Sequence, residues 1–315
     1  MANEDSTKTV QHEKVIVLGA GPAGLTAALY AARAELNPLV LTGMELGGQV
    51  SLTNTIENYP GFPEGIGGAQ LGELFQHQAE RFGARFEFDV ATAVDFTQRP
   101  FVVRTYSKEF TSDSVILATG ATPVKLNVPG EELLTGHGVS YCATCDGWFF
   151  KNKDVVVVGG GDSALEEGLF LTRFANKVRI IHRRDAFRAG ALLQKRLSEN
   201  EKVEVIFDSV VEKINGDGKV SSVDLRNVKT NAKTTLATDG VFVFIGHSPN
   251  TELYQGQLAM NERGFLIVDE KMATSVPGIF AAGEVGDPVY KQVITSAGLG
   301  AAAAIQVGKY LEDMN

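Results

Sequence analysis

Residues 14–24 read KVIVLGAGPAG, and this segment decides the fold class. Its apolar first part is typical of a parallel strand that is buried on both faces. Gly19, Gly21 and Gly24 follow with the spacing G-x-G-x-x-G, and the alanine-rich stretch Leu25–Ala34 predicts a helix. A strand, a glycine turn and a helix in this order form a unit that holds a dinucleotide pyrophosphate at the helix N-terminus.

The same pattern recurs in the second half of the chain. Asp154–Val158 predicts another buried strand, and Gly159, Gly161 and Ala164 follow it as the related G-x-G-x-x-A turn. A helix is expected over Ser163–Phe174, with a further strand after it. The sequence therefore predicts an α/β protein with two Rossmann-like dinucleotide-binding domains.

The C-terminal stretch Gly278–Leu311 matches neither unit and is too small to form its own core. We place it on the first domain, which makes the second domain an insertion. Glycine and proline mark both expected linkers, near Gly120–Pro123 and Gly246–Asn250. The predicted boundaries are 1–121 with 249–315 for the first domain and 122–248 for the second.

The residues that follow each loop predict which cofactor it binds. Arginine in this region accommodates the 2′-phosphate of NADP, whereas an acidic residue binds the ribose of NAD. After the second loop stand His182, Arg183, Arg184 and Arg188, so NADPH is expected there. The segment after the first loop, Thr42–Glu45, has no arginine. FAD is the expected occupant of that loop, because a nicotinamide needs a second redox centre through which its electrons pass to a dithiol.

The chain has two cysteines, Cys142 and Cys145, in a C-x-x-C pair followed by Asp146. Two sulfurs alone do not complete a four-ligand zinc site, so we expect no metal. In a reducing compartment such a pair is more often catalytic than structural. The Asp146 carboxyl is the candidate to donate or accept a proton when a thiolate leaves. Trp148, Phe149 and Phe150 follow the pair directly and are expected in the core. If they are partly exposed, we expect them to form a docking surface for a protein disulfide.

Composition excludes several other classes of protein. The net charge of −9 and the lack of a basic face argue against a nucleic-acid partner. Glycines and a proline interrupt the uncharged run Val15–Ala32, so we expect neither a membrane span nor a signal core there. The expected location is the cytoplasm.

The segment CATCDG, residues 142–147, lying between two dinucleotide loops, closely resembles the active site of low-molecular-weight thioredoxin reductases. The resemblance covers nearly the whole chain. It implies an FAD-containing homodimer that passes electrons from NADPH to flavin, then to the dithiol, then to thioredoxin. It also favours Cys145 as the cysteine that faces the flavin, which the spacing alone leaves open.

The family usually has aspartate where Glu284 stands, at a contact with the flavin's ribityl chain. Both nicotinamide and dithiol must reach one flavin, so we expect two domain orientations with the linkers as a paired hinge. The residues assigned to cofactor binding are Gly19, Gly21, Pro22, Ala23, Gly24, Thr42, Gly43, Met44, Glu45, Gly47, Gly48, Gln49, Asn58, Gly120, Gly159, Gly161, Asp162, Ser163, His182, Arg183, Arg184, Arg188, Ile245, Gly246, Gly283, Glu284, Lys291, Gln292 and Val293.

Other classes of protein explain the motifs less well. A peroxiredoxin-linked reductase would need an extra N-terminal domain, and a ferredoxin–NADP reductase of related fold would lack the C-x-x-C pair. A dithiol oxidase for small molecules would not need the arginine set, and a dinucleotide sensor would leave Cys142 and Cys145 unexplained. A related flavoprotein that reduces another protein or small-molecule disulfide is the remaining alternative.

Overall fold

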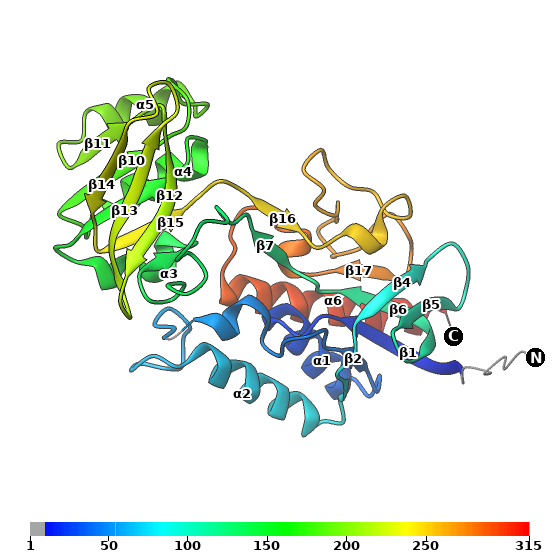
Figure 1. Ribbon diagram of the computed structural model, residues 1–315. Coiled ribbons are helices and arrows are strands. Elements are labelled where there is room, and N and C mark those ends of the chain that lie inside the picture. The colour runs from blue at the N-terminus through cyan, green and yellow to red at the C-terminus, as the bar shows by residue number, and fades with distance from the viewer. Residues whose placement is uncertain (1–9, 54, 315) are drawn as a thin grey trace, which may run out of the picture. The chain divides into compact units, whose positions relative to one another are not determined.

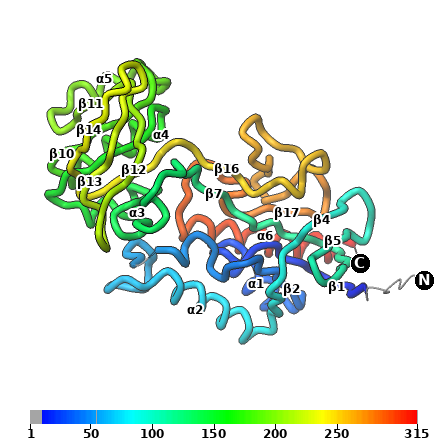
Figure 2. Tube along the Cα trace, viewed as in Figure 1, coloured from blue at the N-terminus to red at the C-terminus, as the bar shows by residue number. Residues whose placement is uncertain are grey.

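The computed structural model describes residues 10–53 and 55–314. The chain divides into two compact units: the first ends at Thr122 and resumes at Ser248, and the second is Pro123–His247. Strand β7 (Ala121–Pro123) carries the chain out of the first unit and β16 (His247–Pro249) brings it back. These two short strands pair with each other, and Figure 2 follows the chain through them.

The first unit is built on a mixed sheet of seven strands within its described residues (Figure 1). The strand order is β3-β2-β1-β6-β5-β4, and β17 pairs with the C-terminal part of β6 on the same edge as β5. Strands β1, β2, β3, β6 and β17 are parallel, and β4 and β5 pair in antiparallel fashion. The elements are β1 (Val10–Leu18), α1 (Pro22–Arg33), β2 (Leu39–Leu41), η1 (Gly48–Leu52), α2 (Gly68–Glu80), β3 (Arg85–Glu87), β4 (Ala91–Asp95), β5 (Phe101–Thr105), β6 (Glu109–Leu117), η3 (Glu252–Tyr254), β17 (Ile279–Ala281), η4 (Gly283–Val285) and α6 (Val293–Asp313).

Strand β1 shows why an uninterrupted apolar run forms the centre of this unit. Val15 and Val17 point to one face of the sheet and pack with the small residues of α1 and α6. Ile16 and Leu18 point to the opposite face and pack with side chains of β5 and β6. Because both faces are covered, every position in this part of the strand is apolar.

The second unit, which the structure describes in full, has a parallel sheet of five strands in the order β11-β10-β9-β15-β8. A separate antiparallel sheet, β12-β13-β14, packs through Val223 and Leu225 against the core of the parallel sheet. The elements are β8 (Val139–Ser140), α3 (Ala143–Asp146), η2 (Gly147–Phe150), β9 (Asp154–Val158), α4 (Asp162–Leu171), β10 (Lys177–Ile181), α5 (Ala191–Ser198), β11 (Val203–Ile206), β12 (Ser209–Gly216), β13 (Val220–Asn227), β14 (Lys233–Ala237) and β15 (Gly240–Val243).

This architecture confirms the predicted fold class, with one Rossmann-like domain inserted into another. Residues 10–13, which precede the apolar run, also belong to regular structure. They extend β1, because their backbone pairs with Glu109–Ser112 of β6 although the first three side chains are exposed. No helix within residues 10–53 and 55–314 is long and apolar enough to cross a membrane.

Candidate active site

The turn between β1 and α1 is shaped by three glycines with different tasks. Gly19 has φ of 105°, and a Cβ there would lie 2.4 Å from the Ala118 carbonyl oxygen. A Cβ on Gly24 would lie 1.9 Å from the Gly19 carbonyl oxygen, so helix and turn touch at this point. Gly21 differs, because nothing lies within 4 Å of the place where its Cβ would be. No side chain caps α1, so its first turn faces open space with its positive end, as a phosphate site requires.

Two further predicted segments lie against the start of α1. The Gly47 N–H donates to the Ala20 carbonyl oxygen at 2.8 Å. A Cβ on Gly48 would lie 3.2 Å from the Gly21 Cα, and one on Gly283 would lie 2.8 Å from the Ala23 Cβ. The structure therefore brings three segments that are far apart in sequence around one helix N-terminus.

The other predicted cofactor-binding residues of the first unit differ in their exposure and in their hydrogen bonds. The Thr42 hydroxyl is buried and donates to the Gly43 carbonyl oxygen at 3.0 Å, whereas the Met44 side chain is 88% exposed. Asn58 Nδ2 donates to Gln292 Oε1 at 3.2 Å. The remaining candidates are the exposed Glu45, Gln49 at the start of η1, Pro22 in the first turn of α1, Gly120, whose carbonyl oxygen accepts the Asn250 N–H, Lys291 with positive φ, and Val293 at the start of α6.

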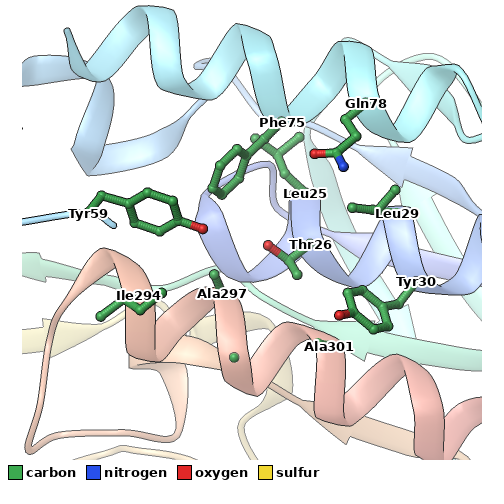
Figure 3. Close-up of a pocket in the computed structure, with 11 residues that line it drawn as sticks. Leu25, Thr26, Leu29, Tyr30, Tyr59, Phe75, Gln78, Ile294, Ala297 and Ala301 are labelled. Carbon is green, nitrogen blue, oxygen red and sulfur yellow. The ribbon is translucent and has the colours of Figure 1, made fainter. Parts of the chain in front are cut away.

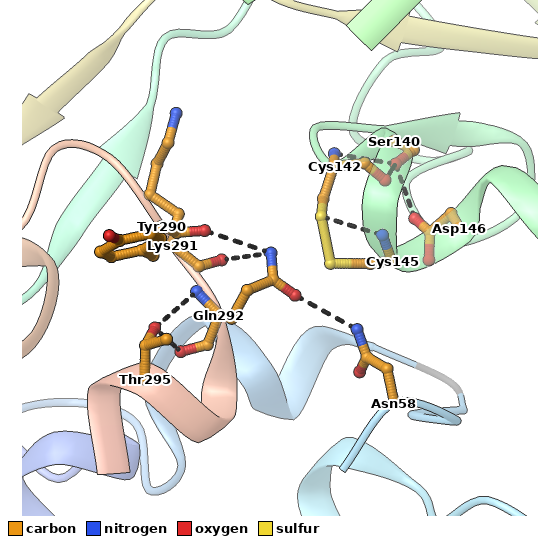
Figure 4. The surroundings of a disulfide bond; sticks show 9 residues. All are labelled: Asn58, Ser140, Cys142, Cys145, Asp146, Tyr290, Lys291, Gln292 and Thr295. Atoms are coloured by element: carbon orange, nitrogen blue, oxygen red, sulfur yellow. Dashed lines mark hydrogen bonds between the residues drawn. A yellow bond between two sulfur atoms is a disulfide. The ribbon is translucent and has the colours of Figure 1, made fainter. Parts of the chain in front are cut away.

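Gln292 caps the N-terminus of α6, and its side chain links two parts of the first unit. Gln292 and Thr295 form a capping box, and Gln292 Nε2 also donates to the carbonyl oxygens of Tyr290 and Lys291 (Figure 4). Through the bond to Asn58, the loop after η1 is tied to the start of α6. The predicted residues Asn58 and Gln292 are thus direct neighbours.

Glu284 lies in η4 next to Gly283, and its carboxyl is largely enclosed. Burial raises the pKa of Glu284 to about 7, with Lys291 lowering it and Asp287 raising it as smaller effects. A carboxyl in this environment is balanced between its neutral and charged forms near neutral pH. It can therefore donate a hydrogen bond to a ligand in one form and accept one in the other.

The turn between β9 and α4 repeats the first loop with one addition. Gly159 has φ of 152°, and a Cβ there would lie 2.3 Å from the Phe244 carbonyl oxygen. The His182 ring packs against Gly160, where an added Cβ would lie 2.3 Å from the ring. Gly161 has nothing within 4 Å of its missing Cβ, and no side chain caps α4. This helix N-terminus is also open to a phosphate.

His182 is 6% exposed, and its Nε2 has no hydrogen-bond partner among the described residues. Burial lowers the pKa of His182, and the charges of Arg184, Arg188 and Arg183 lower it further. These effects favour the neutral ring, which packs against the loop at Gly160. Contact between this ring and a nucleotide stays a prediction.

Arg183, Arg184 and Arg188 surround the second loop with positive charge. All three side chains are exposed, and none forms an ion pair with a described residue. The Arg188 N–H donates to the Gly160 carbonyl oxygen at 2.8 Å, so the arginine segment is fixed to the glycine turn. The neighbouring candidates are Asp162, whose Oδ1 accepts the Gly190 N–H at 2.8 Å, the exposed Ser163, and Ile245 and Gly246, which lie at the end of this unit.

The two cysteines form a disulfide across the short helix α3, with 5.3 Å between their Cα atoms (Figure 4). Cys142 precedes the helix, and its Sγ accepts the Cys145 N–H at 3.1 Å. Asp146 ends the helix, and burial raises the pKa of its carboxyl above the usual range. A disulfide and a carboxyl with a raised pKa thus share one turn of chain.

The aromatic run after the pair divides between core and surface. Phe150 is buried against Phe242, as expected for a core residue. The expectation that Trp148 and Phe149 are core residues is wrong, since they are 54% and 41% exposed. Trp148 packs edge-on against Phe174 at 5.9 Å between ring centroids, which leaves the rest of the ring accessible.

Two contacts around the disulfide were not found from the sequence. The Ser140 hydroxyl donates to Asp146 Oδ2 at 2.6 Å, and the Tyr141 hydroxyl donates to Glu131 Oε1 at 2.9 Å. Serine, tyrosine and glutamate are common residues without a diagnostic spacing. Only their nearness to the C-x-x-C pair could have drawn attention to Ser140 and Tyr141.

The chain belongs to the pyridine nucleotide-disulphide oxidoreductase family, whose sequence pattern matches residues 13–300. Among individual proteins, it is similar to the thioredoxin reductase of Rickettsia conorii, with 48% identity over 95% of this chain and 98% of that protein. The thioredoxin reductase of Coxiella burnetii is 45% identical over 97% of this chain and 98% of its own length. The crystal structure of thioredoxin reductase from Streptococcus pyogenes MGAS5005 has a TM-score of 0.92 and 43% identity, covering 96% of this chain and 99% of that chain.

Proposed function

We propose that this chain is an NADPH-dependent thioredoxin-disulfide reductase, with FAD in the first unit and NADPH in the second. The observation that carries the proposal is the Cys142–Cys145 disulfide beside Asp146. It lies in the same unit as a glycine loop that is followed by three exposed arginines without ion pairs to described residues. The full-length similarity to proteins named thioredoxin reductase supports the same substrate.

The residues around α1 fit FAD. The first turn of the helix offers backbone N–H groups to the pyrophosphate, and Gly21 leaves room for its oxygens. The turn at Gly47 and Gly48, which packs on Gly21, and Glu284 beside Gly283 would hold the rest of the cofactor. FAD would supply there the two-electron redox chemistry that links a nicotinamide to the Cys142–Cys145 disulfide.

The second loop fits NADPH because it also offers an open helix N-terminus to a pyrophosphate, and because three arginines add positive charge. Gly161 and the uncapped start of α4 leave space and N–H groups for a pyrophosphate. Arg183, Arg184 and Arg188 would hold the 2′-phosphate, because guanidinium groups match phosphate oxygens in pairs. Each of these side chains is exposed and has no competing carboxylate among the described residues.

The reduced cysteine pair then transfers its electrons by thiol–disulfide exchange. One thiolate attacks a sulfur of the partner disulfide, which breaks that S–S bond and forms a mixed disulfide. The partner's other sulfur leaves as a thiolate in this first step. The second cysteine then attacks the first, restores the Cys142–Cys145 bond and releases the partner sulfur that had been attacked. Two electrons and two protons pass to the partner. Burial raises the pKa of Asp146 and so favours its protonated form, from which it would supply a proton to the leaving thiolate.

A protein partner is supported by the surface next to the disulfide. Trp148 and Phe149 are exposed directly after the pair, and large aromatic side chains are enriched in protein interfaces. Lys151 lies over the Trp148 ring at 5.0 Å, which adds a cationic edge to this surface. We propose that thioredoxin docks here.

We also propose that the second unit adopts two orientations on its linkers. The disulfide and the NADPH loop belong to the same unit, whereas the flavin would be held by the other. The linkers carry Gly120 with φ of 69° and Gly246 with φ of 134°, and neither has backbone packed against the place of a Cβ. A cross-link that locks the disulfide against the flavin should abolish rapid flavin reduction by NADPH. Unimpaired turnover in the locked protein would refute this mechanism.

We propose a homodimer that forms through the first unit. A cavity of about 260 Å³ opens between α1, α2 and α6, lined mainly by apolar side chains such as Leu25, Leu29 and Phe75 (Figure 3). Tyr30 and Ile294 at this cavity are 40% and 45% exposed. A second copy would cover them. Sedimentation should show a dimer, and Ile294→Glu should weaken it.

The test of the function is NADPH consumption coupled to thioredoxin. The purified protein should be yellow, and NADPH should bleach it. Cys142→Ser and Cys145→Ser variants should still be bleached but should no longer reduce thioredoxin. A cysteine-free variant with full turnover would contradict the assignment. If wild type is bleached but reduces only another protein or small-molecule disulfide, the alternative substrate class is correct.

A further inference from the structure

We propose that Ser140 is a positioning residue, whose hydroxyl orients the Asp146 carboxyl and sets the pH range in which that carboxyl exchanges its proton with the cysteine pair. The inference rests on the proposed disulfide chemistry. It concerns a residue outside the C-x-x-C-D motif, and Ser140 touches neither sulfur by any hydrogen bond that the structure shows.

The hydroxyl stands in the middle of a chain of hydrogen bonds. The Cys142 N–H donates to Ser140 Oγ at 3.1 Å, and Ser140 Oγ donates to Asp146 Oδ2 at 2.6 Å (Figure 4). The Cys142 carbonyl oxygen, at 3.2 Å, is a second possible acceptor. Since the hydroxyl has one proton, the closer carboxyl oxygen receives it, and this bond is strongest when the carboxyl is ionised. Ser140 thus joins the backbone of the first cysteine to the acid.

Ser140 is held in place by contacts that do not involve Asp146. It lies in the edge strand β8, where it pairs with Phe242 of the neighbouring strand β15, and it is 4% exposed. The next residue, Tyr141, is anchored by its hydroxyl to the buried Glu131. Because pairing with β15 and the anchored Tyr141 hold Ser140 in place without Asp146, the hydroxyl sets the position of the carboxyl and not the reverse.

The charge state of Asp146 is governed by two opposed effects. Burial raises its pKa, and the hydrogen bond from Ser140 lowers it, because the donor stabilises the charged form. The elements beside it, η2 and α4, carry as charged side chains only Asp162, Glu166 and Glu167, and none of these contributes to the shift. Ser140 is therefore the group that keeps this buried carboxyl able to ionise.

The sign of the expected change follows from this balance. Removing the hydroxyl takes away the donor and leaves burial unopposed, so Asp146 should hold its proton to higher pH. A hydrogen bond to a charged group is strong enough to move a titration by about one pH unit or more. A residue needed only for packing would lower the rate at every pH and would leave the inflection where it is.

The experiment compares pH profiles of cysteine alkylation by iodoacetamide after reduction with dithiothreitol, which needs neither NADPH nor thioredoxin. The inflection that Asp146→Asn abolishes in wild type identifies the carboxyl. In Ser140→Ala this inflection should move upward by about one pH unit. Ser140→Thr keeps the hydroxyl and should restore the wild-type position. Ser209→Ala removes another buried hydroxyl of the same unit and should not move it.

Two further measurements make the outcome decisive. In the Asp146→Asn background, Ser140→Ala should add less than about a twofold change, because residues that act through one another are not additive. Ser140→Cys keeps the volume but donates weakly, so its thioredoxin turnover should show the same upward shift even if the alanine variant does not fold.

An unmoved inflection in Ser140→Ala, or an equal loss of rate at all pH values, would overturn the inference. If wild type reduces no thioredoxin while the alkylation inflection still moves, the proposed function fails and the role of Ser140 stands. If wild type reduces thioredoxin and the inflection does not move, only the role of Ser140 fails.

Discussion

Glu131 offers the most direct test of how the cysteine segment is held. Its side chain is 2% exposed and accepts three hydrogen bonds: from the Leu126 N–H at 2.8 Å, the Asn127 N–H at 2.7 Å and the Tyr141 hydroxyl at 2.9 Å. The first two donors follow the first linker, and Tyr141 directly precedes Cys142. One carboxylate thus ties the entry of the second unit to its redox pair.

The expected loss in the free energy of unfolding follows from the number of hydrogen bonds to Glu131 and from their partial exposure to water. Replacing Glu131 with alanine leaves three donors without their acceptor. Because the Leu126 and Asn127 groups are only partly buried, water compensates in part, and about 1 to 1.5 kcal/mol per bond is expected. The free energy of unfolding should therefore fall by about 3 to 5 kcal/mol. Tyr141→Phe removes one bond and should cost about 1 kcal/mol.

The assay is urea unfolding followed by tryptophan fluorescence. Trp148 is the single tryptophan of the chain and lies in the second unit, so its signal reports this unit. Glu132→Ala is the matched control, since the Glu132 side chain is 91% exposed. Its only ion pair with a described residue joins Glu132 Oε1 to Lys125 Nζ at 3.8 Å. Its cost should stay below about 0.5 kcal/mol.

A double-mutant cycle separates the tyrosine bond from the rest. In the Glu131→Ala background, Tyr141→Phe should cost clearly less than it does alone, because its partner is already gone. If Glu131→Ala unfolds at the same urea concentration as Glu132→Ala, or if the two changes add without coupling, the network does not hold this segment.

Three other expectations concern the nucleotide sites. Arg183→Ala and Arg184→Ala should each weaken NADPH about ten- to a hundredfold and NADH far less in a binding titration, whereas equal losses would mean that the arginines serve stability. Burial raises the pKa of Glu284 to about 7, so the stability that its neutral form provides is present below its unfolded pKa and lost as pH rises to about 7. Glu284→Gln should therefore be more stable than flavin-free wild type near pH 8 by about 3 kcal/mol in urea, with no difference near pH 4. Gly24→Ala places a Cβ 1.9 Å from the Gly19 carbonyl oxygen, so it should cost about 1–3 kcal/mol and release the flavin; a yellow protein with unchanged Tm would contradict this.

The sequence by itself determined the class of fold and the family. The predicted strand range 154–158 agrees with β9, because an apolar run followed by a glycine turn leaves little choice of conformation. The two glycine turns were recognisable because close approach of backbone to backbone excludes a side chain, which fixes both residue type and spacing. The C-x-x-C pair was recognisable because only sulfur forms the disulfide.

The tertiary structure alone decided what depends on pairing between distant segments. The exposed residues 10–12 join β1 through backbone bonds to β6, which side-chain polarity does not encode. The different surroundings of Trp148 and Phe150 arise from packing of η2 on its neighbours, not from their shared aromatic character. Ser140, Glu131 and Tyr141 acquire their roles only from the fold. A hydroxyl or carboxyl of a common residue type becomes a specific contact only when the folded backbone places it within hydrogen-bond distance of its partner.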